Sequence, residues 1–408
     1  MVGVNGGDTT TTPRPSAGSP TPPMFWRAED LPRWSRWQRS QWPLSRRAAH
    51  AVRTARAAVR RSPDAPEADL QVLLPAGDVH TLVAVESAGP TQRAALVAPV
   101  AALAEGRAAV SGDAPHAVAR VLDGIGWVMP ADVAEQLASD LPGHTGLTAV
   151  PATDPAVAER LAGLRRVLVA GEYLPAGRVA VRWARERGAR VGVVQHGLLA
   201  LSTPPVPRDA TLYAFTQRDA DWWTQDRADV RTVVVGSALL EAARQDTAAA
   251  PAPASTDGPG VFLGQLHGAE LPRRAFAAAA EQYIRVTGAA YRPHPAERDR
   301  LSRGQHARWE KQGITVDRTG APLAETTGPV AAVFSTGILE AAQAGRPAWA
   351  VHPDPPAWLT EFWDRYGIAR WTPGGGDGPA GPAPTPPLVA PTPDPAAAIA
   401  EDFWKDPA

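Results

Sequence analysis

Residues 329–351 read PVAAVFSTGILEAAQAGRPAWAV, and this stretch decides the class of fold. A run of small and β-branched apolar residues leads directly into Ser335-Thr336-Gly337, a helical pattern follows, and a second apolar run begins at Pro347. A strand, a helix and another strand in direct succession are typical of a parallel α/β unit. The stretch therefore predicts an α/β fold for this part of the chain.

The same alternation fills two regions on either side of a low-complexity segment, TAAAPAPASTDGPG, at 247–260. The composition of this segment is typical of an interdomain linker. Apolar runs predict strands at 69–76, 80–87, 124–131, 146–152, 165–173, 189–197, 210–215 and 230–236 before it, and at 260–265, 289–295, 314–318, 329–336 and 347–353 after it. Alternation of this kind implies doubly wound parallel sheets. We expect two Rossmann-like domains facing each other across a cleft.

The predicted organisation has seven parts. They are a disordered tail at 1–23, a Trp/Arg-rich segment at 24–68, a first Rossmann-like domain at 69–246, the linker at 247–260, a second Rossmann-like domain at 261–371, a Pro/Gly-rich loop at 372–395 and a C-terminal helix at 396–408.

Composition excludes several functional classes. The 408 residues carry 41 Lys and Arg against 42 Asp and Glu, a balance that argues against a general nucleic-acid binder. With no cysteine, disulfides, thiol nucleophiles and thiolate metal sites are excluded, and a reducing cytoplasm is the expected location. No run of about 18 apolar residues predicts a membrane span, and no signal-peptide pattern opens the chain.

The Trp/Arg-rich segment contains Trp26, Trp34, Trp37 and Trp42, followed by an arginine-rich stretch. One interpretation is a peripheral membrane contact, with tryptophans at the headgroup level and arginines facing anionic lipid. The alternative is that the tryptophans pack on the domain and the arginines form a solvated face.

Ligands of parallel α/β sheets bind outside the carboxyl ends of the strands, so polar residues there are the candidates. In the first domain Glu172 follows one strand, and it can act as a general base or interact with a helix dipole. Gln195, His196 and Gly197 end the next strand, where the histidine is either a base, an orienting group or structural.

In the second domain His294 ends a strand within YRPHP, residues 291–295. Pro293 and Pro295 restrict the backbone on both sides of it. Its imidazole can donate to a phosphate oxygen, and Arg292 can add charge.

Phe334-Ser335-Thr336 ends a neighbouring strand, and together with His294 it predicts a phosphate-binding site, called the donor site below. Ser335 and Thr336 lie at a helix N-terminus, which attracts anions, although an ordinary helix cap is the alternative. Gly337 permits close approach of a ligand, and Glu340, one turn on, can reach sugar hydroxyls. The donor-site prediction also includes Gly264 and Gln265, and His267 lies near the predicted crossing between domains.

Familiar motifs are missing. The chain has no Walker A sequence, no G-x-G-x-x-G after a strand, no H-E-x-x-H and no G-x-S-x-G elbow. The acidic residues form no D-x-D cluster, so we expect no metal site.

VVQHG at 193–197, YRPHP and the segment from Phe334 to Val351 resemble, in this order, bacterial GT-B glycosyltransferases of capsule and wall-polymer synthesis. The similar groups are the polysialyltransferases and sialyltransferases, the capsular Kdo transferases and the CDP-glycerol glycerophosphotransferases. The resemblance implies that His294-Pro295 and Ser335-Thr336 hold the phosphate of a CMP-activated donor. It also implies an acidic general base in the first domain, for which Glu172 is the match.

The sequence therefore predicts a metal-independent, inverting glycosyltransferase. Its donor would be a sugar such as a nonulosonic acid activated by CMP or another nucleotide, and its acceptor a cell-surface glycan or wall polymer. Three alternatives stay open: a CDP-glycerol-type polyol-phosphate transferase, a nucleotide-sugar 2-epimerase and an inactive GT-B scaffold that binds glycans.

Overall fold

A computed structural model provides the structure of the protein. It describes residues 31–40, 47–48, 51, 67, 69–109, 115–143, 146–200, 202–225, 227–249, 260–268, 270–321, 323–374 and 383–405. The predicted tail at 1–23, Trp26, Trp42 and most of the predicted linker lie outside these residues.

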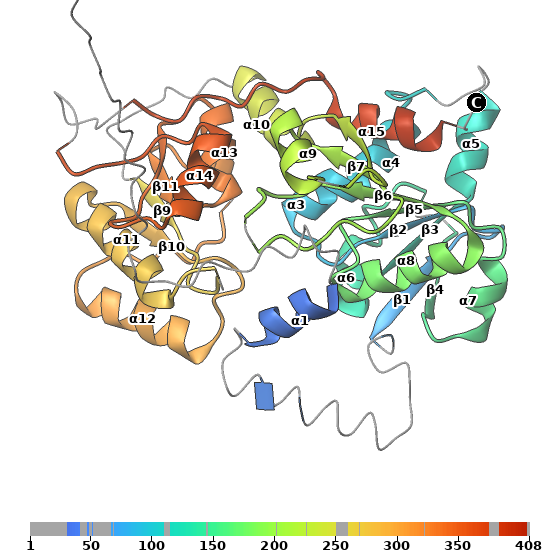
Figure 1. Ribbon diagram of the computed structural model, residues 1–408, viewed down its shortest axis with the longest axis horizontal. Coiled ribbons are helices and arrows are strands. Elements are labelled where there is room, and N and C mark those ends of the chain that lie inside the picture. The colour runs from blue at the N-terminus through green and yellow to red at the C-terminus, as the bar shows by residue number, and fades with distance from the viewer. Residues whose placement is uncertain are drawn as a thin grey trace, which may run out of the picture.

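The first domain is built on an eight-stranded sheet of order β4-β1-β3-β2-β5-β6-β7-β8 (Figure 1). Its strands are β1 (Leu70–Leu74), β2 (Thr81–Ala84), β3 (Ile125–Pro130), β4 (Thr148–Pro151), β5 (Arg166–Val169), β6 (Arg190–Val194), β7 (Thr211–Ala214) and β8 (Arg231–Val234). From β3 to β8 all neighbours are parallel, with Leu82 opposite Val167 and Leu168 opposite Gly192.

The expectation of a wholly parallel sheet is wrong at one edge. Strand β1 is antiparallel to both β3 and β4. The link from β1 to β2 contains no helix. Parallel pairing needs a crossover connection, usually a helix, and this short link cannot provide one.

The second domain is built on a parallel four-stranded sheet of order β10-β9-β11-β12. Its strands are β9 (Val261–Leu263), β10 (Ala290–Arg292), β11 (Val330–Ala332) and β12 (Ala348–Ala350). The strand predicted at 314–318 is reduced to one bridge between Val316 and Tyr291. Asp317 accepts a hydrogen bond from the Thr319 N–H at 3.0 Å, which turns the chain away from the sheet.

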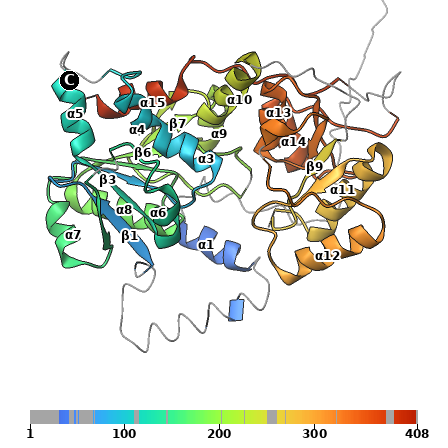
Figure 2. The same ribbon diagram turned by 180° about the vertical axis from the view of Figure 1, so that it is seen from behind.

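Helices cover both sheets (Figure 2). Around the first lie α1 (Leu31–Ser40), α3 (Pro90–Gln92), a π-helical turn (Arg93–Val97), α4 (Ala98–Ala104), α5 (Pro115–Asp123), α6 (Ala131–Leu137), α7 (Pro155–Arg160), α8 (Pro175–Arg187), α9 (Gln217–Trp223) and α10 (Ala238–Ala249). The second domain contains α11 (Arg273–Thr287), α12 (Arg300–Lys311), a 3-10 turn (Leu323–Glu325), α13 (Thr336–Gln343) and α14 (Ala357–Tyr366). Helix α10 continues three residues into the predicted linker.

The last helix, α15 (Pro395–Trp404), returns to the first domain and packs against α4 (Figure 1). Gly192 in β6 makes room for it, because a Cβ there would come within 2.9 Å of the Phe403 ring. Tyr213 of β7 donates to Asp402 at 2.8 Å. The chain therefore crosses between the domains twice.

For Trp34, the structure decides between membrane contact and packing on the domain. It is 3% exposed, and its Nε1–H donates to the Ser202 carbonyl at 2.6 Å. This tryptophan packs on the first domain. None of the helices formed by the described residues has the length and apolar character needed to cross a bilayer.

A buried polar cluster joins the domains where α9 meets α14. The Asp219 side chain is 0% exposed and accepts from Tyr366 Oη at 2.5 Å and from Arg365 Nη1 at 3.3 Å. Arg365 Nη2 also donates to the Leu199 carbonyl at 2.5 Å, and the Leu199 N–H donates to Tyr366 Oη at 2.8 Å. One carboxylate of the first domain thus compensates a buried guanidinium of the second.

We predict that Asp219→Ala lowers the free energy of unfolding by about 3 kcal/mol, because it removes the buried counter-charge of Arg365 and leaves only the exposed Glu361 carboxylate beside it. Urea unfolding measures the effect. Asp221→Ala, at an exposed position on the same helix, is the matched control and should change stability by less than about 0.5 kcal/mol. Equal losses in the two variants would show that the buried pair has no special role.

Candidate functional site

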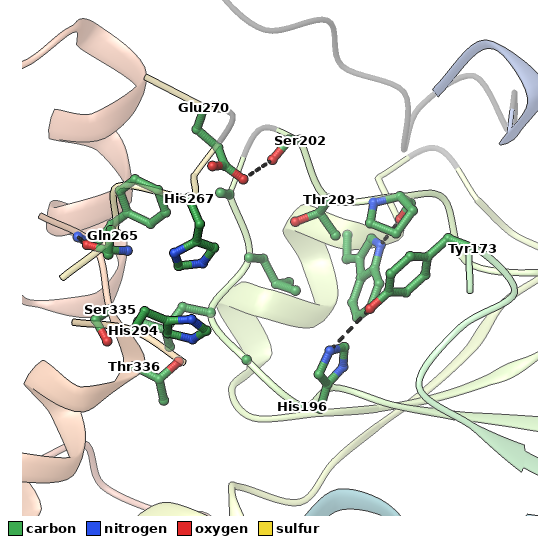
Figure 3. A pocket seen from close by; sticks show the side chains of 17 residues that line it. Tyr173, His196, Ser202, Thr203, Gln265, His267, Glu270, His294, Ser335 and Thr336 are labelled. Carbon is green, nitrogen blue, oxygen red and sulfur yellow. Dashed lines mark hydrogen bonds between the residues drawn. The ribbon is translucent and has the colours of Figure 1, made fainter. Parts of the chain in front are cut away.

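A cavity of about 320 Å³ lies between the two domains, at the carboxyl ends of their parallel strands (Figure 3). From the first domain it is lined by Tyr173, residues 196–200 and 202–204, and Trp223. From the second domain come Gln265, His267, Glu270, His294 and the segment Phe334–Thr336. The cavity thus brings His196, Gln265, His294, Ser335 and Thr336 together, as the positions of these residues after strands predict.

Two histidines of the second domain stack on each other beside Ser335 and Thr336 (Figure 3). The rings of His267 and His294 are 4.0 Å apart and inclined by 22°. His294 Nδ1 accepts from the Ala296 N–H at 3.1 Å, so in the neutral ring Nε2 carries the proton. Partial burial lowers the pKa of His294, and burial followed by the charge of His294 lowers the pKa of His267 to about 4. Both rings are neutral N–H donors at pH 7.

Helix α13 begins directly at the cavity. Ser335 is its N-cap, and Ser335 Oγ accepts from the Gly337 N–H at 3.1 Å. This bond uses an oxygen lone pair, so the hydroxyl proton can still be donated to a ligand. Gly337 is required for packing, because a Cβ there would come within 2.4 Å of Leu263 Cδ1. The helix-cap and ligand-binding interpretations of Ser335 are therefore compatible.

Gln265 ties two strand ends together. Its Oε1 accepts from the backbone N–H groups of Val333, at 3.2 Å, and Phe334, at 3.0 Å. Gly264 does not line the cavity. A Cβ at Gly264 would lie 2.5 Å from Tyr291 Oη, so this glycine serves packing behind the site.

Four other residues predicted for the donor site lie outside the cavity lining: Gly337, Arg292, Pro295 and Glu340. Arg292 Nε donates to Asp317 at 2.8 Å, which directs the guanidinium away from the cavity wall. Pro295 is exposed in the loop after His294. Glu340 lies one turn into α13, where burial raises its pKa and Arg346 opposes the rise.

His196 and Tyr173 form the opposite wall, with Tyr173 Oη 3.2 Å from His196 Nε2 (Figure 3). Burial lowers the pKa of His196 to about 4. Its Nδ1 is buried, and a hydrogen bond between the ring and the Val194 backbone opposes the fall in its pKa. Tyr173 packs edge-on against Trp34, with ring centroids 5.4 Å apart, so α1 supports this wall.

Gln195 and Gly197 shape the loop that carries His196. Gln195 Oε1 accepts from the Phe215 N–H at 2.9 Å, and its Nε2 donates to the Gly197 carbonyl at 3.0 Å. These two bonds fix the backbone on both sides of the histidine.

Glu172 does not fit its predicted role as general base. Its carboxylate pairs with Arg185 Nη1 of α8 at 2.9 Å, and it does not line the cavity. Gly171, with φ +145°, reverses the chain after β5, so Glu172 faces α8 while Tyr173 faces the cavity. The loop after β5 thus reaches the cavity, as the strand-end rule predicts, but it does so through Tyr173 and not through Glu172.

The same rule could have selected Glu86, which follows the apolar run 82–85 and lies two residues after the end of β2, the neighbour of β5. Glu86 Oε1 accepts from the Gly177 N–H at 2.9 Å, in the first turn of α8. Burial raises the pKa of Glu86 to about 7, although backbone donors from Gly177 and Ala176 and the charge of Arg178 oppose the rise. A carboxylate that changes charge near neutral pH thus anchors α8 next to Tyr173.

We predict that Glu86 makes the protein less stable as pH rises. Between the unfolded pKa of about 4.5 and the folded pKa of about 7 the folded state binds more protons, so stability falls through this window. The loss is about 3 kcal/mol at most, since one pKa unit corresponds to about 1.4 kcal/mol. Chemical unfolding at pH 5 and pH 8 measures it.

Glu86→Gln should remove this part of the pH dependence, whereas Glu135→Gln, at an exposed position on α6, should leave it intact. A wild-type profile that Glu86→Gln does not alter would contradict the assignment.

One hydrogen bond crosses the cavity, from Ser202 Oγ of the first domain to Glu270 Oε1 of the second at 2.9 Å (Figure 3). Within the described part of the chain, no group of three His, Cys, Asp or Glu side chains is arranged to hold a metal ion.

Comparison with known proteins assigns the chain to no family. No family model matches the chain, and no curated protein does. Among solved structures, Arabidopsis thaliana UGT89C1 complexed with UDP aligns over 80% of this chain and 91% of that chain, with 10% identity and a TM-score of 0.35.

The predicted fold class is confirmed: two Rossmann-like α/β domains face each other across a cleft, the GT-B arrangement.

Proposed function

We propose that the protein is a glycosyltransferase that moves a sugar from a nucleotide-activated donor to a glycan or wall-polymer acceptor, without a metal ion. The observation that carries the proposal is the cavity between the domains. One wall presents hydrogen-bond donors that can bind a phosphate at a helix N-terminus. The other wall presents His196, whose imidazole is neutral at pH 7.

The donor wall suits a phosphate. His267, His294, Ser335 and Thr336 supply N–H and O–H donors, and the start of α13 adds the positive end of a helix dipole. These groups would stabilise the negative charge that develops on the leaving phosphate. The described residues that line the cavity include neither lysine nor arginine, which favours a donor with a single phosphate, of the CMP type.

The opposite wall suits an acceptor hydroxyl. With the proton on Nδ1, His196 Nε2 accepts from Tyr173 Oη, and an acceptor hydroxyl can take the place of the tyrosine. In an inverting displacement the hydroxyl proton passes to Nε2 while the oxygen bonds to the anomeric carbon. The bond from that carbon to the phosphate oxygen breaks, and its electron pair leaves with the nucleotide.

The identity of the sugar is the finer part of the proposal. A CMP-activated nonulosonic acid follows from the sequence resemblance and fits the single-phosphate argument. A CDP-activated polyol phosphate, the alternative within the same fold, would place two phosphates in the cavity. The nucleotide that binds best therefore distinguishes the two.

We predict that CMP binds more tightly than CDP, UDP or GDP in calorimetric titrations. His294→Ala should weaken binding about 10- to 100-fold, because it removes a donor to a charged phosphate. His80→Ala is the control. His80 directly precedes β2, so it lies at the amino-terminal end of the strand, whereas the cavity lies at the carboxyl ends, and its replacement should leave binding unchanged. Failure of all four nucleotides to bind would overturn the proposal.

We predict that His196→Ala lowers kcat about 10²- to 10⁴-fold, as expected for loss of a general base, while Glu172→Gln changes it less than about twofold. Release of nucleotide from the best-binding donor, with and without EDTA, measures both effects, and EDTA should not alter the rates. The reverse ranking of the two variants would restore Glu172 as the base.

A further inference from the structure

Glu297 is a buried carboxylate behind the donor wall, and the sequence analysis did not select it. Its side chain is 0% exposed, although glutamate is almost never fully buried without partners. It follows the YRPHP stretch and precedes α12. A charge in this position is costly unless several hydrogen bonds compensate it.

Glu297 contacts the two chain segments that carry the stacked histidines. Its Oε1 accepts from the Leu266 N–H at 3.0 Å, and Leu266 directly precedes His267. Its backbone N–H donates to the His294 carbonyl at 2.8 Å. One residue therefore holds the backbone at both members of the pair.

The remaining contacts of Glu297 fix its carboxylate. His306 Nε2 of α12 lies 2.8 Å from Oε2, and Tyr291 Oη of β10 lies 3.0 Å from Oε2 and 3.1 Å from Oε1. Gly264 leaves room for this arrangement, because a Cβ there would come within 2.6 Å of Oε1. The carboxylate is held from β10, α12 and the loop after β9, so its position has little freedom.

The charge of Glu297 also acts on His294. Burial lowers the pKa of His294, and the negative charge of Glu297 opposes that effect. For His267, burial, His294 and Arg273 lower the pKa, whereas Asp299 raises it. A phosphate arriving at the pair would favour protonation, and Glu297 stabilises the resulting positive charge from behind.

We propose that Glu297, held by His306 and Tyr291, is a positioning residue that sets the geometry of the His267–His294 pair for a phosphate group. The inference rests on the proposed function for the identity of the ligand. It does not require Glu297 to touch the ligand.

The test compares nucleotide affinity between pH 6 and pH 8 in wild type, Glu297→Gln, His294→Ala and the double variant. Glutamine keeps the shape and removes the charge. Glu297→Gln should weaken CMP binding about tenfold and flatten its increase toward low pH. In the His294→Ala background the same change should weaken binding less than about twofold, because the imidazole through which Glu297 acts on the ligand is absent.

Glu310→Gln is the matched control, since Glu310 is an exposed glutamate of α12, the helix that follows Glu297. If Glu297→Gln does not fold, Tyr291→Phe removes the hydroxyl contacts to Glu297 and keeps the aromatic ring. A folded Glu297→Gln with wild-type affinity and pH profile overturns the proposal, and so does an equal loss with and without His294.

A separate readout needs no nucleotide. In a ¹H NMR titration of the histidine rings, Glu297→Gln should lower the pKa of His294, since a nearby negative charge has been removed. An unchanged titration overturns the positioning role. A lowered pKa in a protein that binds no nucleotide would instead keep that role and reject the proposed function.

Discussion

The buried pair of Asp219 and Arg365 is the constraint on which the cleft depends. It connects α9 of the first domain to α14 of the second, and through Leu199 it holds the loop that carries His196. Gln195, at the start of this loop, is bound to the backbone of the next strand, β7. The loop is therefore fixed from both domains. Because this loop forms one wall of the cavity, the Asp219–Arg365 pair helps to set the distance between the two walls.

The two walls of the cleft are built on different physical grounds. The donor wall uses exposed strand ends and a helix start, with a buried carboxylate, Glu297, behind the histidines. The acceptor wall is a packed aromatic layer in which Trp34, Tyr173 and His196 contact one another in sequence. The first arrangement favours charge on a ligand, and the second keeps an imidazole neutral. The proposed transfer reaction would use this asymmetry, since a phosphate must leave and a hydroxyl must lose its proton.

Much of the site follows from one rule, that ligands bind at the carboxyl ends of parallel strands. It located His196, His294, Ser335 and Thr336, which line one cavity although the first and last are 140 positions apart in the chain. It failed for Glu172, because the turn at Gly171 directs adjacent side chains in opposite directions. It also passed over Glu86, whose carboxylate binds a helix start that comes 91 residues later.

The sequence by itself determined the α/β class, the two domains and the strand ends that carry polar side chains, because these depend on local periodicity and on residue types. Tertiary structure alone decided which polar groups share the cavity and which form ion pairs outside it. Arg292 pairs with Asp317 and Glu172 with Arg185, so both are diverted from the cleft. Glu297 gains its partners from β10, α12 and the loop after β9. Such pairings join residues that are distant in sequence, and local sequence patterns do not predict them.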